Sequence, residues 1–391
     1  MMRKCSLHLL DAWGSGSPSE LAVAIDERQK SGLPLFDLVN TSVQKEGFEF
    51  DQDLLAECMA EGVKKSRYYV PHAQGNPEAR AAVAGYHGHD CSPDDIILTP
   101  GSSLAYYYAF RLLANPGEEI LCPQPTYPLF DDLAFLAGVR VRRYYLNGTN
   151  ATGWRFDAHD LEFQITPATR AIVMVSPHNP TGMVINPQEM SAIADIARRH
   201  HLPIVFDEVF REFTHLPNLP VCRPSEFDVP LCLTLNGFSK MFSLPGMKIG
   251  WIVVEGADTA LKNRFLQAIS YLNDSLLPVQ ETTQAAVSML FERGICFCQR
   301  AADLSTERVR AMSAHWRSCG WSVPEPEAGP YLILDSNGGL ETRQEELDFV
   351  RRLVRDEGIV FHPAEFYGLP TGAIICTAVS RPPWPQVICP K

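Results

Sequence analysis

The chain has 391 residues, of which 46% are hydrophobic and 20% charged, as is typical of a globular protein long enough for one large and one smaller domain. The net charge of −12 and the lack of a long basic run argue against nucleic acid as a partner. Eleven cysteines without a repeated CxxC spacing, and no apolar stretch near the ~20 residues of a membrane span, predict a cytoplasmic protein without a metal site or membrane contact. Residues 1–10 show no cleavage pattern of a signal peptide.

The first two thirds of the chain alternate short apolar runs with amphipathic helices. An entry segment, residues 1–45, has helical periodicity from Pro18 to Gln29. This βα alternation predicts a mostly parallel sheet covered on both faces. The apolar runs are 96–99, 119–122, 139–146, 171–175, 203–206 and 231–235, and the predicted helices are 102–114, 128–137 and 187–201, the last capped by Asn186.

After Trp251 the pattern changes to longer helices and few strands. We expect an α+β end domain that packs with the entry segment. Its predicted helical regions are 257–293, 300–319 and 342–356, and its strands are 331–334 and 373–377. The predicted division is an N-terminal segment (1–45), a large domain (46–255) and a linking helix with a small domain (256–391).

One lysine stands in a turn of small residues. Lys240 follows the apolar run 231–235, and Lys248 comes eight positions later. A lysine amine forms a Schiff base with an aldehyde, and a second cation can hold an anionic group. These residues therefore suggest a pyridoxal phosphate (PLP) site, with Lys240 as covalent anchor and Lys248 at the phosphate. A solvated surface loop is the alternative interpretation.

Three more polar segments follow predicted strands. They are 100–105, 176–182 and 206–210. Open α/β sheets bind ligands at the carboxyl ends of their strands, so we expect these segments to meet Lys240. Ser102 and Ser103 begin a helix, where free N–H groups and the helix dipole favour a phosphate, although ordinary capping explains them too.

Together the four segments resemble the class I/II aminotransferases of the fold-type I PLP-dependent enzymes, over about residues 35–380. The resemblance rests on Asn-Pro-Thr-Gly (179–182), Asp-Glu-Val (207–209) and Ser-Lys-x-x-x-x-Pro-Gly-x-Lys-x-Gly (239–250). It implies an α/β fold-type I architecture, with a large domain built on a mostly parallel seven-stranded sheet and a smaller α+β domain. It also implies a cytoplasmic aminotransferase of amino-acid metabolism and biosynthesis, which moves an amino group between an amino acid and a 2-oxo acid by a ping-pong mechanism.

The same resemblance implies roles for individual residues. Lys240 would carry the proton between the substrate α-carbon and the cofactor. Asp207 would keep the pyridine nitrogen protonated, which makes the ring a stronger electron sink. Asn179 would donate a hydrogen bond to the ring 3′-oxygen, and Tyr127 would stack on the ring.

The remaining implied residues lie at the two ends of the cofactor site. Gly101, Ser102, Ser103 and Lys248 would hold the phosphate, together with Tyr69 from the other subunit of a homodimer. Substrate contacts are implied at Asn40 and Arg381.

The sequence departs from the family pattern at several positions. Phe210 stands where the family has a tyrosine whose phenol bonds the 3′-oxygen. Lys248 replaces an arginine, and it offers a point charge instead of a bidentate fork. The family arginine that binds the substrate carboxylate aligns with Thr377; Arg381 is four residues on, and it would share a strand face only if the strand continued into Pro382.

Two alternatives remain open. Another PLP enzyme of the same fold, such as a β- or γ-lyase, a cyclase or an oxidase-like enzyme, would use the same Lys240, Asp207 and Asn179. The other alternative is a non-catalytic binding protein that keeps the fold.

Overall fold

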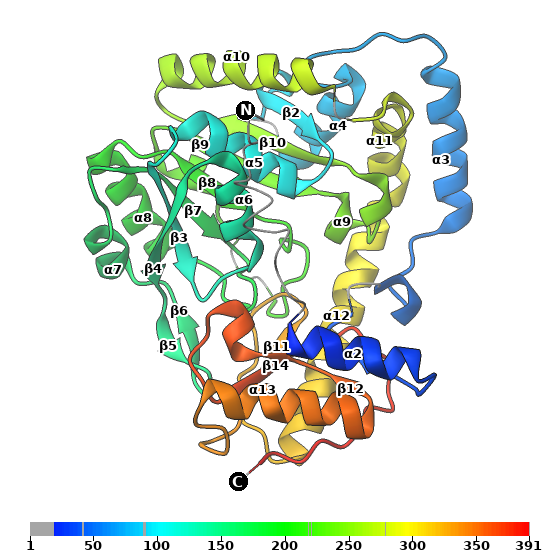
Figure 1. Cartoon of the computed structure of the whole chain (residues 1–391). Coiled ribbons are helices and arrows are strands. Elements are labelled where there is room, and N and C mark those ends of the chain that lie inside the picture. The colour runs from blue at the N-terminus through cyan, green and yellow to red at the C-terminus, as the bar shows by residue number, and fades with distance from the viewer. Residues whose placement is uncertain are drawn as a thin grey trace, which may run out of the picture.

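The computed structural model describes residues 19–40, 43–88, 91–217, 219, 221–277 and 279–390. A seven-stranded sheet with strand order β2-β10-β9-β8-β7-β3-β4 forms the centre of the protein (Figure 1). From β9 to β4 the neighbouring strands are parallel, and β10 runs antiparallel to both β2 and β9. The predicted mostly parallel sheet is therefore confirmed. Its strands are β2 (Ile96–Thr99), β3 (Glu119–Gln124), β4 (Arg140–Tyr145), β7 (Thr169–Val175), β8 (Ile204–Asp207), β9 (Cys232–Gly237) and β10 (Gly250–Glu255).

Helices cover both faces of the sheet, because successive strand side chains point to opposite sides. Ile120 and Val173 pack with helices α5, α6 and α10 in one core cluster. Their chain neighbours Leu121 and Ile172 pack with α7 and α8 in another. Helices α4 and α11 cover the same face as α7 and α8 at the β2 and β10 end, and α3 lies outside α11. These helices are α3 (Gln52–Lys65), α4 (Pro77–His87), α5 (Ser102–Leu113), α6 (Leu129–Ala137), α7 (Ala158–Phe163), α8 (Pro187–His200), α10 (Thr259–Leu276) and α11 (Glu281–Gly294).

Helix α8 begins where the sequence predicts. The Asn186 side chain accepts a hydrogen bond from the backbone N–H of Glu189, the Glu189 carboxylate accepts one from the backbone N–H of Asn186, and Pro187 occupies the first turn. This reciprocal cap satisfies two N–H groups that a helix start leaves open. The helix ends at His200, and the next residue, His201, takes a left-handed φ of 51°.

The C-terminal part forms a smaller layer with the N-terminal segment. A three-stranded antiparallel sheet with order β11-β14-β13 lies beside helices α2 and α13 (Figure 1). Strand β1 of the N-terminal segment pairs with β12, so the two ends of the described chain meet here. The elements are α2 (Glu20–Lys30), β1 (Phe36–Asp37), β11 (Tyr331–Asp335), α13 (Arg343–Arg352), β12 (Ile359–Val360), β13 (His362–Pro363) and β14 (Ala373–Thr377).

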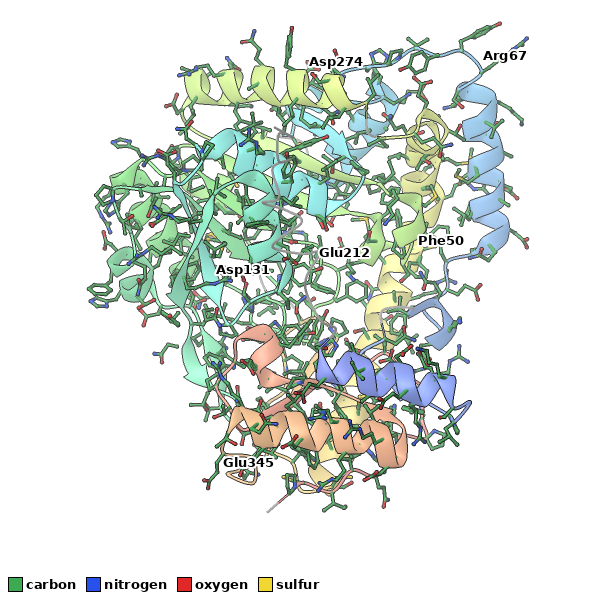
Figure 2. The ribbon with its side chains drawn as sticks, in the orientation of Figure 1. Phe50, Arg67, Asp131, Glu212, Asp274 and Glu345 are labelled. Atoms are coloured by element: carbon green, nitrogen blue, oxygen red, sulfur yellow. The ribbon has the colours of Figure 1, made fainter. Side chains whose placement is uncertain are left out.

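Helix α12 (Cys296–Ser318) joins the two parts. Near its start Phe297 packs with Phe50 and the core around α11, and near its end Met312 and Trp316 pack in the core of the small part. Figure 2 shows Phe50 in the upper part of the molecule, beside α11. One continuous helix therefore contributes to both cores.

The region 257–293 differs from the single helical stretch that its pattern predicts. Helix α10 ends at Leu276, Leu277 takes a left-handed φ of 43°, and α11 begins only at Glu281. Helix α10 packs on α5 and β10, and α11 packs on α3 and α4, so both lie with the large sheet. The domain boundary near 255 and the rest of the predicted division stay predictions, and residues 1–18 lie outside the described part of the chain. No helix in the described ranges is both long and apolar enough to cross a lipid bilayer.

Candidate active site

A cavity of about 350 Å³ lies between the large sheet and the smaller part. The large part contributes Ser102, Ser103, Tyr127, Phe210, Phe213, Ser239, Lys240, Ser243 and Pro245 to its lining. The remaining lining residues come from the N-terminal segment, α12 and the small sheet: Asn40, Val43, Phe48, Ser305, Pro330, Tyr331, Thr377 and Val379.

The residues predicted from the sequence reach this cavity because their strands end at one edge. β2, β3, β7, β8 and β9 point the same way in the sheet. Asp207 is the last residue of β8, and Lys240 follows β9 in a short helix, α9 (Phe238–Met241). Ser102 follows β2 at the start of α5. The carboxyl edge of a parallel sheet is where such folds hold ligands, so the predicted convergence is observed.

Lys240 is partly buried and lines the cavity. Its Nζ lies 5.7 Å from the centroid of the Phe210 ring. Burial lowers the pKa of Lys240, and the negative charge of Asp207 partly opposes that shift. A lysine whose pKa is lowered holds more of the neutral form, which is the form that attacks an aldehyde carbon.

Asp207 is buried at the end of β8 and is not itself part of the cavity lining. Its Oδ2 accepts a hydrogen bond of 2.8 Å from the Tyr106 hydroxyl, and its Oδ1 accepts one of 2.9 Å from the backbone N–H of Val209. Burial raises the pKa of Asp207 to about 6, against the lowering effect of both hydrogen bonds. The buried carboxylate therefore lacks a cationic partner strong enough to offset its desolvation.

Asn179 connects the large part of the protein to the small sheet. Its Nδ2 donates to the hydroxyl of Tyr331 at 3.4 Å, and its buried Oδ1 has no hydrogen-bond partner. Tyr331 begins β11 and lines the cavity, and its ring stands edge-on to Phe210 with centroids 6.1 Å apart. Tyr106 and Tyr331 are site residues that the sequence analysis missed.

The start of α5 forms another side of the cavity, through Ser102 and Ser103. Gly101 has a φ of +119°, which favours glycine. Gly250 of β10 packs so closely on it that a Cβ at position 250 would lie 2.9 Å from the Gly101 Cα. Ser102 and Ser103 follow with the free N–H groups of a first helical turn. Tyr127 is 38% exposed and lines the cavity.

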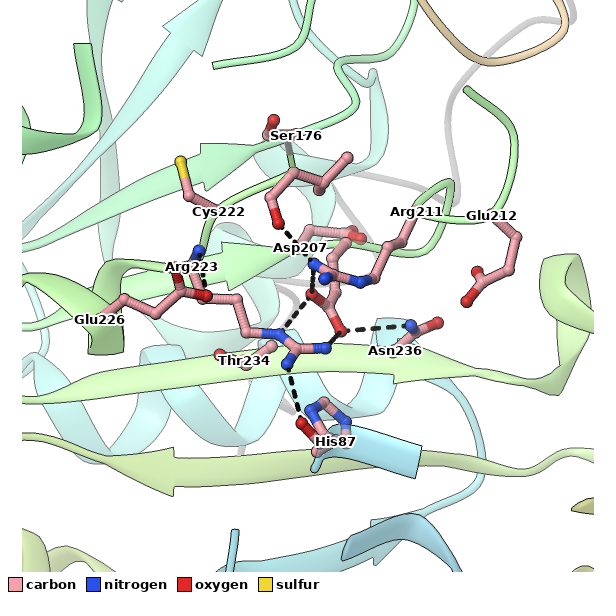
Figure 3. Close-up of polar contacts among 12 residues, drawn as sticks. His87, Ser176, Asp207, Arg211, Glu212, Cys222, Arg223, Glu226, Thr234 and Asn236 are labelled. Atoms are coloured by element: carbon pink, nitrogen blue, oxygen red, sulfur yellow. Dashed lines mark hydrogen bonds and ion pairs between the residues drawn. The ribbon is translucent and has the colours of Figure 1, made fainter. Parts of the chain in front are cut away.

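A buried ion pair fixes the strand ends that carry Asp207 and Lys240. Glu208 receives bonds of 2.8 and 2.9 Å from Nε and Nη2 of Arg223, and one of 3.2 Å from Arg211. The Nδ2 of Asn236, in β9, donates to Glu208 at 3.4 Å. Figure 3 shows Arg211, Arg223 and Asn236 converging on this point, with His87 on the far side of Arg223. The Arg223 and Arg211 guanidinium groups hold the pKa of the Glu208 carboxyl below its usual value despite burial. The network ties β8 to β9 next to the cavity.

The profile of the family described as "Aminotransferase class I and II" matches residues 49–382. The chain belongs to this family. It is 26% identical over 314 residues to an aspartate aminotransferase of Sulfolobus acidocaldarius, which covers 77% of this chain and 75% of that protein. It is 28% identical over 332 residues to the S-alkyl-thiohydroximate lyase SUR1 of Arabidopsis thaliana, with 81% and 70% covered. The structure of an alanine aminotransferase from Pyrococcus furiosus shares the fold, with a TM-score of 0.83, 22% identity and 96% and 95% of the two chains covered.

Family membership confirms the predicted α/β fold-type I architecture, the PLP cofactor and the aminotransferase activity. The alternative of a lyase finds support in one relative, whereas aspartate, alanine and tyrosine aminotransferases support transfer. The observed donor set also fits PLP. The amine of Lys240 and the N-terminus of α5 line the cavity, and the same edge of the sheet carries a buried carboxylate with a raised pKa, Asp207, and a buried amide oxygen without a partner, that of Asn179.

Lys248, Arg381 and Tyr69 are not among the residues that line the cavity. Lys248 is exposed, with a left-handed φ of 52°, and is not part of the lining. Arg381 is exposed as well, and its backbone N–H donates to Glu46 at 2.9 Å. Tyr69 is 70% exposed and lines a different cavity, together with Leu277, which follows α10. The roles of Lys248, Arg381 and Tyr69 stay predictions.

Proposed function

We propose that the cavity holds PLP on Lys240 and that these residues transfer an amino group between an amino acid and a 2-oxo acid. The observation that carries this assignment is the partly buried Lys240, whose amine lines the cavity with a lowered pKa and interacts electrostatically with the Asp207 carboxylate. When bound, PLP supplies an aldehyde for the lysine and an electron sink for the substrate carbon.

The protein residues position the cofactor and move the proton. Burial makes the negative charge of Asp207 unfavourable, and the protonated pyridine nitrogen of a bound cofactor would give this charge a partner. The second N–H of the Asn179 amide is available for the ring 3′-oxygen, beside the bond to Tyr331. Once released from the cofactor, the Lys240 amine takes the proton from the substrate α-carbon and returns it on the cofactor side. Phe210 packs beside this amine without a hydrogen-bonding group.

The phosphate end of the site is proposed to be shared between subunits. Gly101, Ser102 and Ser103 would bind phosphate oxygens through the first turn of α5. Lys248 of the same chain and Tyr69 of a second subunit would complete this end. Large apolar side chains are exposed beyond α3 and at the end of α10, which is typical of a surface that a partner covers. They include Tyr68, Tyr69, Val70, Tyr271, Leu276 and Leu277, and Figure 2 shows the neighbouring Arg67 at the outer end of α3.

We also propose a cytoplasmic role in amino-acid biosynthesis. The ten cysteines in the described part of the chain are all free thiols, which suits a reducing compartment.

Borohydride reduction followed by peptide mass spectrometry tests the assignment. The cofactor should be fixed on Lys240, and Lys240→Ala should lose both the label and the visible absorbance. Lys262→Ala is the matched control, because Lys262 pairs with Asp95 away from the cavity. A label on another lysine would contradict the proposal. Incubation with an amino acid alone should form stoichiometric pyridoxamine phosphate, whereas catalytic release of ammonia and an oxo acid would indicate the lyase alternative.

A further inference from the structure

A buried carboxyl group belongs to the turn that carries two residues of the cavity lining. Glu212 stands between Phe210 and Phe213 in the chain, and both phenylalanines line the cavity. The backbone N–H of Phe213 donates to the carbonyl oxygen of Phe210 at 2.9 Å, which closes the turn. Glu212 Oε1 accepts a hydrogen bond from the Tyr86 hydroxyl of α4, and its buried Oε2 has no hydrogen-bond partner among the described residues. The carboxyl therefore joins this side of the cavity to α4.

The surroundings of Glu212 favour its protonated form. Burial raises the pKa of Glu212 to about 7, and the negative charge of Glu208 adds to this rise. The Tyr86 hydrogen bond and the charge of Arg211 act in the opposite direction. Arg211, however, bonds to Glu208 at 3.2 Å, and Figure 3 shows Glu212 without a bond to any residue drawn there. On α12, burial and the Glu212 charge raise the pKa of the Cys298 thiol to about 12, so this neighbour is neutral near pH 7.

Hydrogen bonds connect Tyr86 to the segment that carries Lys240. The Nδ2 of Asn236, in β9, donates to the Tyr86 hydroxyl at 3.4 Å. The Oδ1 of the same amide accepts from the backbone N–H of Gly237 at 2.7 Å. Gly237 ends β9, and α9 with Lys240 follows directly. The Asn236 side chain therefore ties the start of this segment to Tyr86.

Aromatic packing gives a second connection to α9. The Tyr86 ring stacks on Phe291 of α11 with centroids 5.5 Å apart, and it stands edge-on to Trp251 of β10 at 6.1 Å. Both of these rings pack on Phe238, with centroid distances of 5.2 Å for Phe291 and 5.9 Å for Trp251. Phe238 is the first residue of α9. A displacement of Tyr86 is therefore expected to reach Lys240 through packed rings as well as through Asn236.

We propose that Glu212 is a positioning residue for the amino-group transfer, which holds Phe210 and Lys240 at the cavity while its carboxyl is protonated. This inference rests on the proposed function, because it acts through Lys240. When the carboxyl loses its proton to solvent, the charge lies on a buried oxygen without a donor, so it must draw in water or take Arg211 from Glu208. Either change opens the turn and shifts Tyr86. The positioning is complete below the ordinary pKa of 4.5 and is lost as the pH rises through about 7.

Infrared spectroscopy of enzyme that contains isotope-labelled glutamate measures this ionisation without turnover. The carbonyl band of the protonated Glu212 carboxyl, identified by its loss in Glu212→Gln, should titrate with a midpoint near pH 7 in the PLP-loaded enzyme. Tyr86→Phe removes a hydrogen bond that favours the charged form, so it should raise this midpoint by about one unit. A wild-type midpoint near the ordinary 4.5 would overturn the inference.

The pH dependence of kcat separates positioning from a merely structural role. Glu212→Gln cannot ionise, and its amide oxygen still accepts a hydrogen bond from Tyr86. The ratio of kcat in this variant to kcat in wild type should rise about tenfold from one pH unit below the midpoint to one unit above it, because the protonated fraction of wild type falls by that factor. Glu292→Gln, at an exposed site on α11, is the control and should show a constant ratio. A flat ratio for Glu212→Gln would also overturn the inference, even if the variant is less stable than wild type.

Failure of this inference can be told apart from failure of the proposed function. If borohydride fixes the cofactor on Lys240 but the kcat ratio stays flat, the positioning role fails and the proposed function stands. If the cofactor is not fixed on Lys240, the proposed function and the positioning role both fail, and only the infrared midpoint stands.

Discussion

Replacing Asp207 with asparagine should stabilise the cofactor-free protein at neutral pH and, at the same time, disable the holoenzyme. Burial raises the pKa of Asp207 from its ordinary 3.8 to about 6. Between these values the folded protein keeps a proton that the unfolded chain has lost. The stability contributed by this carboxyl is therefore full below pH 3.8 and falls as the pH rises through about 6.

The magnitude follows from the size of the shift. At 1.36 kcal/mol per pKa unit, the whole shift corresponds to about 3 kcal/mol, of which roughly 2 kcal/mol or slightly more is lost between pH 4 and pH 7.5. Asparagine does not titrate, so the free energy of unfolding of the variant relative to wild type should rise by about that amount across this range. Urea unfolding of both apo proteins at several pH values measures it, with Asp132→Asn, an exposed site on α6, as the control for the substitution itself.

The holoenzyme should respond in the opposite direction. Asparagine carries no charge to hold a proton on the pyridine nitrogen, so kcat should fall about 100-fold, as for loss of one preorganised electrostatic group. A stability difference that stays flat between pH 4 and pH 7.5, or that favours wild type at pH 7.5, would refute the reasoning about Asp207.

Three further substitutions test other contacts. Tyr106→Phe removes the hydroxyl that stabilises the Asp207 charge, so the pH at which PLP binding falls to half on acidification should rise by about one unit. Tyr108→Phe is the control, because the buried Tyr108 hydroxyl has no hydrogen-bond partner, and it should leave this pH unchanged. Phe210→Tyr adds a phenol beside Lys240 and should lower the pH midpoint of the cofactor's visible absorbance by about one unit; an unchanged midpoint contradicts this. Arg223→Met leaves the Glu208 charge buried and should lower the free energy of unfolding at pH 7 by about 3 kcal/mol or more, and a loss below about 1 kcal/mol would show that the ion pair is not needed.

The residues nearest the chemistry were predictable because each follows a strand. Lys240, Asp207 and Asn179 stand directly after apolar runs, and parallel strands bring such positions together whatever the rest of the chain does. Short motifs around them then identified the family. The same local logic predicted the Asn186 cap of α8.

Their supporting partners were not predictable in this way. Tyr106 is 101 residues from Asp207, and Tyr331 is 152 residues from Asn179. Neither has a pattern of its own, since an aromatic residue inside a helix or at the start of a strand is ordinary core material. Sequence also could not show that the backbone N–H of Arg381 bonds to Glu46, because the two residues are 335 positions apart in the chain.

The Tyr331 and Thr377 side chains lie opposite each other on neighbouring strands of the small sheet, whereas the lysine and the aspartate belong to the large one. The two sheets also share a core cluster, in which Ile172 and Phe206 of the large sheet pack with Ile333 and Ile375 of the small one. A substitution that repacks β11 or β14 is therefore expected to reach β8, the strand that ends at Asp207.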